Sequence, residues 1–265
     1  MTKQVFTVFL LGFILLMSCQ KDEEIILDDL NGDDPEIEKV TVNFHLHQKI
    51  DGDELELNDQ IYATPFGNVY EVTRLRYILS EFTFRTLEGQ LVKFDDFFHF
   101  IDVENENHQS FTLEIPKRNY NRIQFIFGLK GENNQSGIHP TLNAAGWSWP
   151  DPIGGGYHFM QLDGFFVDDQ SEDETYNIHL GNSFSEPDQQ GLSENYQPFS
   201  FDRELYLEIT GNEVVHVHIT MHINNWYKTP NEIDLNDYSG GIMGNHNAQV
   251  TFHENGHDVF SLDIE

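Results

Sequence analysis

The sequence predicts an all-β protein, an antiparallel β-sandwich with long loops rich in glycine and proline. Three observations support this fold class. Short segments with a two-residue alternation of apolar and polar side chains recur between turn signals. No segment of useful length carries the periodicity of an amphipathic helix. Phenylalanine, at 22 residues, supplies the apolar area that two facing sheets bury.

The expected strands follow one another along most of the chain. They cover residues 39–47, 75–86, 90–103, 109–115, 122–129, 157–167, 176–181, 203–210 and 213–223. Glycine, proline, asparagine and aspartate between them favour turns and long loops. Because many short strands with turn signals are typical of a sandwich, we expect one domain over residues 40–265.

The first residues resemble a bacterial lipoprotein signal. Lys3 precedes the apolar run from Val5 to Met17, and the small residue Ser18 stands just before Cys19. An apolar run of roughly a dozen residues is too short to span a hydrocarbon core of about 30 Å. We therefore expect residues 1–18 to be removed and Cys19, the only cysteine, to attach the protein to membrane lipid.

Residues 19–39 form a strongly acidic segment without aromatic side chains, which we expect to be a flexible tether. Acidic residues directly after the lipidated cysteine resemble the signal that sends some Gram-negative lipoproteins to the outer face of the outer membrane. A plain solvated spacer is the alternative. The expected location is the cell envelope, as an outer-membrane lipoprotein on its periplasmic or surface-exposed face.

The whole chain is acidic, with 45 acidic against 14 basic side chains and a formal net charge of −31. Nucleic acid is excluded as a partner, because a phosphate backbone needs a basic surface. An acidic surface raises the local concentration of cations, although charge alone does not make a metal site.

Two expected strands carry histidines at alternate positions, on the face opposite their apolar residues. His45 and His47 lie on the first of these strands, and His216 and His218 lie on the last. Imidazoles two residues apart on one strand face can converge on one ion, and four nitrogens would meet if the strands were neighbours. Imidazole without thiolate suits copper or zinc. For any single histidine, an ordinary polar residue on a solvated face is the alternative.

The segment between residues 127 and 181 combines tryptophans, glycine-rich turns and histidines. Its elements are a W-x-W, a G-Y, a glycine and an H-x-G, formed by Trp147, Trp149, Gly156, Tyr157, Gly164, His179 and Gly181. This pattern resembles the MbnP-like family of copper-binding lipoproteins, named for the periplasmic copper protein associated with methanobactin. The resemblance runs from about Val40 to the C-terminus. It departs from the family just before Trp147, where we would expect a methionine and an aromatic residue.

The resemblance implies a copper site. Proteins similar to MbnP bind one copper ion, and in some of them a tryptophan oxidised to kynurenine by a di-haem partner enzyme joins histidine ligands. Copper is expected here as Cu(I), with zinc the weaker candidate, and His179 is a further candidate ligand. Trp147 and Trp149 would cap the site or be oxidised. Alternatively, the two tryptophans plug the open end of a sandwich, and the alternation around His158 is that of a core histidine.

The C-terminal segment allows two interpretations. A Met243–His246 pair would suit Cu(I), which accepts thioether and imidazole ligands. We prefer a glycine-rich loop followed by a final edge strand.

We expect no catalytic activity. The sequence lacks a G-x-S-x-G elbow, a P-loop and a cysteine for nucleophilic attack. The carboxylate pairs Asp95–Asp96 and Asp168–Asp169 are poor acid–base partners, because neighbouring strand residues face opposite ways.

The expected function is a membrane-anchored protein that holds copper for uptake, storage or delivery. The alternative is a surface lipoprotein that binds glycans or peptides without metal, through exposed aromatics such as Trp147, Trp149, Tyr157 and Trp226.

Overall fold

The computed structural model describes residues 24–25, 38–58, 61–186, 190–206 and 214–265. The signal sequence, Cys19 and most of the acidic tether lie outside these ranges, so their assignment stays a prediction. Within the described ranges, no helix combines the length and the apolar composition that a bilayer crossing requires.

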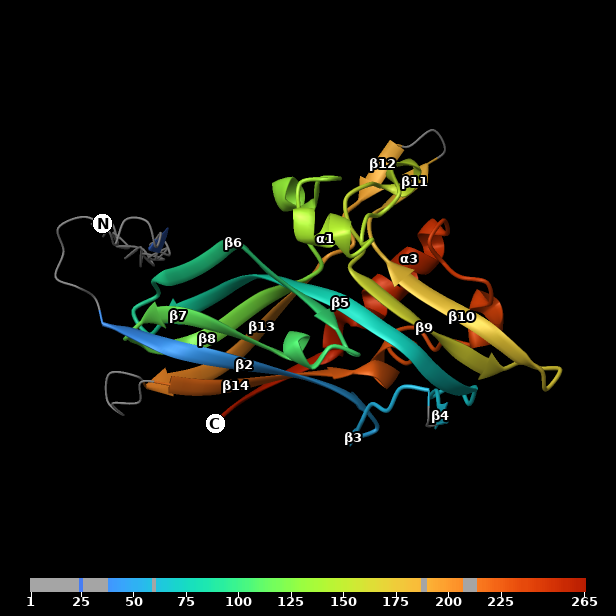
Figure 1. Cartoon of the computed structure of the whole chain (residues 1–265), viewed down its shortest axis with the longest axis horizontal. Helices are drawn as coiled ribbons and strands as arrows, with labels where there is room; N and C mark the ends of the chain where they lie inside the picture. The colour runs from blue at the N-terminus through green and yellow to red at the C-terminus, as the bar shows by residue number, and fades with distance from the viewer. Residues whose placement is uncertain (1–23, 26–37, 59–60, 187–189, 207–213) are drawn as a thin grey trace, which may run out of the picture.

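Two main sheets form the sandwich that the alternation predicts (Figure 1). The larger sheet contains β1 (Glu24–Ile25), β4 (Tyr62–Ala63), β5 (Val69–Thr86), β6 (Leu91–Asp102), β8 (Asn119–Phe127), β9 (Met160–Val167), β10 (Asp173–Leu180) and β13 (Gln197–Tyr206). The smaller sheet contains β2 (Lys39–Ile50), β3 (Asp53–Glu54), β7 (Ser110–Pro116), β14 (Val214–His222) and β15 (Phe260–Ile264). A separate hairpin joins β11 (Ser183–Glu186) to β12 (Gln190–Ser193). Each expected strand is present with shifted ends, except that residues 207–210 of the strand expected at 203–210 lie outside the described ranges.

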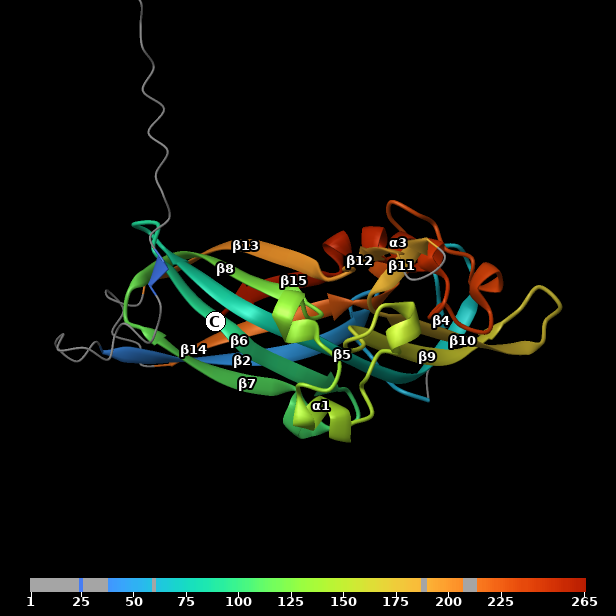
Figure 2. The ribbon, with the colours of Figure 1, turned by 90° about the horizontal axis from the view of Figure 1, so that it is seen from above.

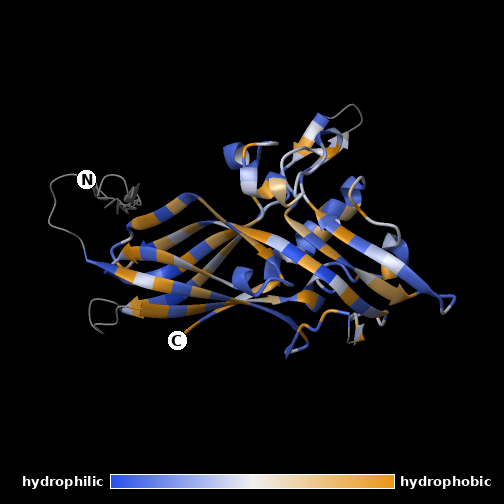
Figure 3. Cartoon of the chain, viewed as in Figure 1, coloured by the Kyte–Doolittle hydropathy of each residue, from blue (hydrophilic) through white to orange (hydrophobic). Residues whose placement is uncertain are grey.

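The central pair of the smaller sheet, β2 and β14, is parallel, whereas most of the other pairs are antiparallel. Its register sets Val217 opposite Phe44 and His218 opposite His45. Since side chains alternate along both strands in the same direction, the apolar faces of β2 and β14 coincide, and so do their polar faces. Figure 3 shows this alternation as orange and blue bands along the strands.

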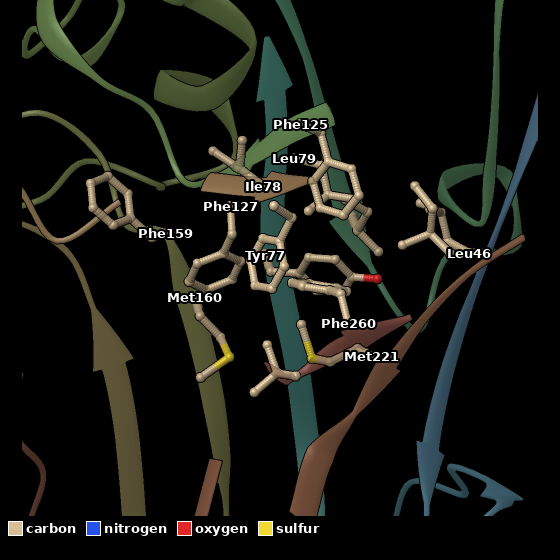
Figure 4. Close-up of a cluster of buried hydrophobic side chains, with 14 of the residues drawn as sticks. Leu46, Tyr77, Ile78, Leu79, Phe125, Phe127, Phe159, Met160, Met221 and Phe260 are labelled. Atoms are coloured by element: carbon tan, nitrogen blue, oxygen red, sulfur yellow. The ribbon is translucent and has the colours of Figure 1, made fainter. Parts of the chain in front are cut away.

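The hydrophobic core fills the space between the sheets (Figure 4). The Phe260 ring lies 6.1 Å from the Tyr77 ring and 5.6 Å from the Phe125 ring, measured between centroids. These side chains come from β15, β5 and β8, so they join the two sheets. Full burial of a large apolar side chain contributes about 1.5–3 kcal/mol, which makes this aromatic cluster a main source of stability.

The helices within the described residues are few and short. They are α1 (Pro140–Ala144) and α3 (His246–Asn255), with 3-10 turns at Glu106–His108, Gly131–Asn134, Asp151–Ile153, Ile223–Tyr227, Leu235–Tyr238 and Gly256–Asp258. The final edge strand is confirmed as β15, but the loop expected before it is partly the helix α3. Asn245 caps this helix by accepting the Ala248 N–H at 3.1 Å. The buried face of α3 includes Gln249 and Asn255, so no apolar stripe indicated the helix.

A long loop between β8 and β9 folds over the larger sheet, on the side away from β2 and β14 (Figure 1). It contains α1 and both tryptophans of the W-x-W element. Seen from above, α1 and α3 lie toward opposite edges of the molecule, with β9 and β10 between them (Figure 2). The loop therefore lies over part of the outward face of the larger sheet, where the Trp147 ring contacts Arg76 of β5.

Candidate metal centre

The four histidines expected on the first and last strands lie together, because β2 and β14 are neighbours. The Nε2 atom of His45 lies 2.8 Å from the Nδ1 atom of His216. The Nε2 atom of His47 lies 3.0 Å from the Nδ1 atom of His218. The rings stack in the order His216, His45, His218, His47, with centroids 5.1, 4.9 and 5.3 Å apart. We call these four residues the imidazole ladder.

The imidazole ladder lies on the outer face of the smaller sheet and is half-buried. Burial, followed by the neighbouring imidazoles, lowers the pKa of His45. Burial also lowers the pKa of His47, against the opposing effect of the Glu54 carboxylate. These two rings are therefore neutral at pH 7 and each keeps one nitrogen lone pair.

His179 lies far from the ladder in the topology, on β10 of the larger sheet. Its register partner on β9 is Gln161, whose own partner on β5 is Arg76. The three side chains therefore form a row on one face of the sheet. The Arg76 guanidinium hydrogen-bonds the Gln161 carbonyl oxygen.

The Nε2–H group of His179 donates a hydrogen bond to the Asp163 carboxylate at 2.7 Å. This bond fixes the tautomer and leaves the lone pair on Nδ1. The Nδ1 atom is buried, and no described residue gives it a hydrogen bond. A carboxylate that holds one nitrogen of an imidazole is the usual support for a histidine that binds metal through the other nitrogen.

His158 lies beside His179, with ring centroids 5.4 Å apart. Its Nδ1–H donates to the Trp147 carbonyl oxygen at 3.0 Å, so the lone pair is on Nε2. Burial lowers the pKa of His158 to about 4, although the Trp147 hydrogen bond acts in the other direction. His158 is buried, at 5 % exposure, as the core interpretation predicts. We call His158 and the partly buried His179, whose side chain is 16 % exposed, the buried histidine pair.

Two tryptophans form a wall around His158. The Trp149 ring meets the His158 ring edge-on at 4.8 Å, and the Trp147 ring lies 5.2 Å from it. Both tryptophans are buried, at 0 % and 1 % exposure. The Trp149 Nε1–H donates to the Asn182 carbonyl oxygen at 2.8 Å, whereas no described residue accepts a hydrogen bond from the buried Trp147 Nε1–H. The Arg76 guanidinium carbon lies 5.2 Å from the Trp147 ring centroid, which gives a cation–π contact.

Two glycines, Gly156 and Gly181, allow the loop with the two tryptophans to pack closely against its neighbours. A Cβ atom at Gly181 would lie 2.6 Å from the Trp149 ring, so a side chain there would push the indole away. Gly156 has a φ of +86° against the Asn134 side chain, a conformation that favours glycine. Asn134 Oδ1 accepts the N–H of the next residue, Tyr157, at 2.9 Å. The G-Y and H-x-G elements of the sequence thus hold the loop against the strands.

A surface pocket of about 350 Å³ opens beside the buried histidine pair. It is lined by Asn177, His179, Gly240, Gly241, Met243 and Gly244. His246 does not line this pocket, and its Nδ1 is hydrogen-bonded to the Ser183 hydroxyl at 2.9 Å. The pocket therefore opens onto the His179 side chain, whereas the Nδ1 atom of that side chain is buried.

Among the residues that the structure describes, no group of three or more His, Cys, Asp or Glu side chains is arranged to hold one ion. Both histidine clusters therefore offer imidazoles in pairs. A structural zinc site needs four protein ligands, so neither cluster provides one.

Asp163, Arg76 and Gln161 were not predicted from the sequence to be parts of a site. His158 was predicted to be a core residue. The pairings that bring these residues beside His179 lie between strands far apart in the chain. Alternation within one strand carries no information on such pairings.

The aromatic residues of the glycan-binding alternative are buried. Trp147, Trp149, Tyr157 and Trp226 are each at most 1 % exposed. They cannot stack on sugar rings in this conformation, so the expectation of an exposed aromatic platform is wrong for these four residues.

Comparison with known proteins agrees with the fold. A model of the MbnP family matches residues 39–245. The solved structure of MbnP from Methylosinus trichosporium is similar, with a TM-score of 0.57 and 12 % sequence identity. That alignment covers 85 % of this chain and 99 % of the other. A search of curated proteins gives no match.

Proposed function

The chain belongs to the MbnP family, and from that premise we propose that it is a copper-binding protein that holds one Cu(I) ion at the buried histidine pair. Family membership supports a copper-related role in general. The observation that carries the assignment to these residues is the buried Nδ1 atom of His179, which has a lone pair and no hydrogen-bond partner among the described residues.

The donor set suits Cu(I). His158 and His179 each offer a neutral imidazole nitrogen, because the pKa of His158 is low and Asp163 fixes the tautomer of His179. Imidazole and thioether ligands both suit Cu(I), and Met243 lines the pocket beside His179. Met243 therefore places a thioether in the wall of the pocket that His179 also lines. His179 keeps the ligand role that the sequence predicted, and His158 is added to it.

The tryptophans shield His158 from water. An indole N–H has no lone pair for a metal, so unmodified Trp147 and Trp149 shield the ion and do not bind it. The cation–π contact with Arg76 helps to hold the Trp147 ring in place. Oxidation of either tryptophan by a di-haem partner enzyme remains a prediction.

The cellular role follows from the expected membrane attachment. We propose that lipid on Cys19 anchors the protein in the outer membrane and that the acidic tether holds the domain away from the lipid surface. The protein would then take up, store or deliver copper without catalysing a reaction of its own.

Titration of the metal-free, full-length protein with Cu(I), in competition with a coloured Cu(I) chelator and without oxygen, tests this proposal. We expect one equivalent to resist the chelator in the wild type. We expect His179→Gln and His158→Gln to lose it. The matched control is His257→Gln, because His257 is exposed and lies outside both clusters. Equal retention of Cu(I) by all three variants would exclude the buried histidine pair.

A further inference from the structure

We propose that the imidazole ladder is a second metal site, separate from the buried histidine pair, and that it binds a divalent transition ion, Cu²⁺ in preference to Zn²⁺, between His47 and His218. The sequence alone suggested the ladder as the copper site. The proposal assigns it another ion and another chemistry, and it does not depend on the assignment of Cu(I) to the buried histidine pair.

Nε2 of His47 and Nδ1 of His218 lie close enough together to be ligands of one ion. A metal–imidazole bond is about 2.0 Å, so two neighbouring ligands of a square-planar ion lie about 2.8 Å apart. The His47–His218 nitrogens are 3.0 Å apart. Tetrahedral and linear geometries would need about 3.3 Å and about 4 Å at the same bond length. The 3.0 Å distance is that of an N–H···N hydrogen bond, so an ion would replace the shared proton once the rings have turned. Cu²⁺ is the preferred ion because it binds imidazole nitrogen more tightly than the other common divalent ions do.

Two negatively charged carboxylates, of Glu54 and Glu265, lie near the His47–His218 pair. The nearest Glu54 oxygen is 3.8 Å from Nδ1 of His47, and the nearest Glu265 oxygen is 3.6 Å from Nε2 of His218. The Glu54 and Glu265 side chains are exposed, at 60 % and 78 %. These carboxylates face the outer ring nitrogens, Nδ1 of His47 and Nε2 of His218, and not the two nitrogens between the rings. They therefore attract a divalent cation to the pair by charge alone, and solvent supplies the remaining oxygen ligands of a tetragonal ion.

The strands that carry His47 and His218 are held rigidly. Below the ladder, the opposite faces of β2 and β14 carry Phe44, Leu46, Val217 and Ile219, all buried in the core. The parallel pairing of β2 and β14 continues from Val214 to His222, so the spacing of the two backbones is fixed on both sides of the histidines (Figure 1). Only ring rotation and a change of tautomer are needed to turn the hydrogen-bonded pair into two ligands.

Electron paramagnetic resonance on the full-length protein titrated with Cu²⁺ tests the proposal. We expect one equivalent of a tetragonal signal with coupling to two imidazole nitrogens. His47→Gln combined with His218→Gln should abolish that signal and leave the Cu(I) equivalent in place, which also shows that the double variant is folded. The double variant His158→Gln, His179→Gln should keep the Cu²⁺ signal and lose the Cu(I) equivalent. An unchanged Cu²⁺ signal in the ladder variant would overturn the proposal.

A second measurement does not depend on a variant. Substoichiometric Cu²⁺ should broaden the imidazole nitrogen resonances of the ladder in a ¹⁵N-histidine NMR spectrum before those of His158 and His179. Broadening that begins elsewhere would contradict the assignment. Zn²⁺ added first should delay the broadening only at high excess, because Cu²⁺ binds nitrogen sites more tightly than Zn²⁺ does.

Discussion

His179 donates one ring N–H to the Asp163 carboxylate across 2.7 Å, and the other ring nitrogen is buried with no hydrogen-bond partner among the described residues. Asp163 sits on β9 and His179 on β10, so the two strands hold both members of the contact. An unpaired buried acceptor costs about 1–3 kcal/mol in the absence of a ligand. A bound metal ion would satisfy it, and the cost therefore favours the loaded protein.

Asp163→Asn should weaken Cu(I) binding about 10- to 100-fold without abolishing it, because the amide no longer holds His179 as a carboxylate does. Competition with a Cu(I) chelator measures the change. Asp202→Asn is the control, since Asp202 pairs with Arg122 on the exposed surface. A loss of equal size in both variants would argue against a positioning role for Asp163.

Gly181→Ala should displace the Trp149 indole and destabilise the protein by about 1–3 kcal/mol, as overpacking of a core does. Urea unfolding measures the free energy. Gly244→Ala is the matched control, because a Cβ at Gly244 meets no atom within 4 Å. If both variants unfolded at the wild-type urea concentration, Gly181 would not be needed to seat the indole.

The stability of the metal-free protein should fall as the pH falls from 6.5 toward 4. The folded-state pKa of His158 is about 4, below its ordinary value of 6.5. In this window the unfolded chain binds a proton that the folded chain does not, so His158 adds up to about 3 kcal/mol to the pH dependence. That stability is fully present above pH 6.5.

Urea unfolding at several pH values checks this dependence. His158→Gln should flatten the curve between pH 6.5 and 4 relative to the wild type, because glutamine does not titrate. The parallel comparison is His257→Gln, whose curve should follow the wild type. A His158→Gln curve as steep as the wild-type one would place the titrating groups elsewhere.

The sequence predicted the fold well, because alternation on single strands carries most of the information. On β2, residues Val40, Val42, Phe44 and Leu46 are buried as the pattern requires, and the same holds on β14. The helix α3 was missed for the opposite reason, since polar side chains fill part of its buried face.

The candidate sites depend on which strands are neighbours, and periodicity does not specify that. The two H-x-H patterns became a ladder only because β2 pairs with β14. Asp163 and Arg76 reach His179 only because β9 lies between β5 and β10. The burial of Trp147 agrees with the alternative in which the W-x-W tryptophans plug the sandwich, but the strands that its loop covers could not be read from a local pattern.

The metal content of the full-length protein, purified from its native envelope and measured by mass spectrometry, tests the central claim most directly. We predict close to one tightly held copper per chain after dialysis against a chelator of divalent ions, in both the wild type and the His47→Gln, His218→Gln variant. The same treatment of His179→Gln should leave little copper. Copper that persists in His179→Gln, or a wild type that holds none and takes up no Cu(I), would contradict the account.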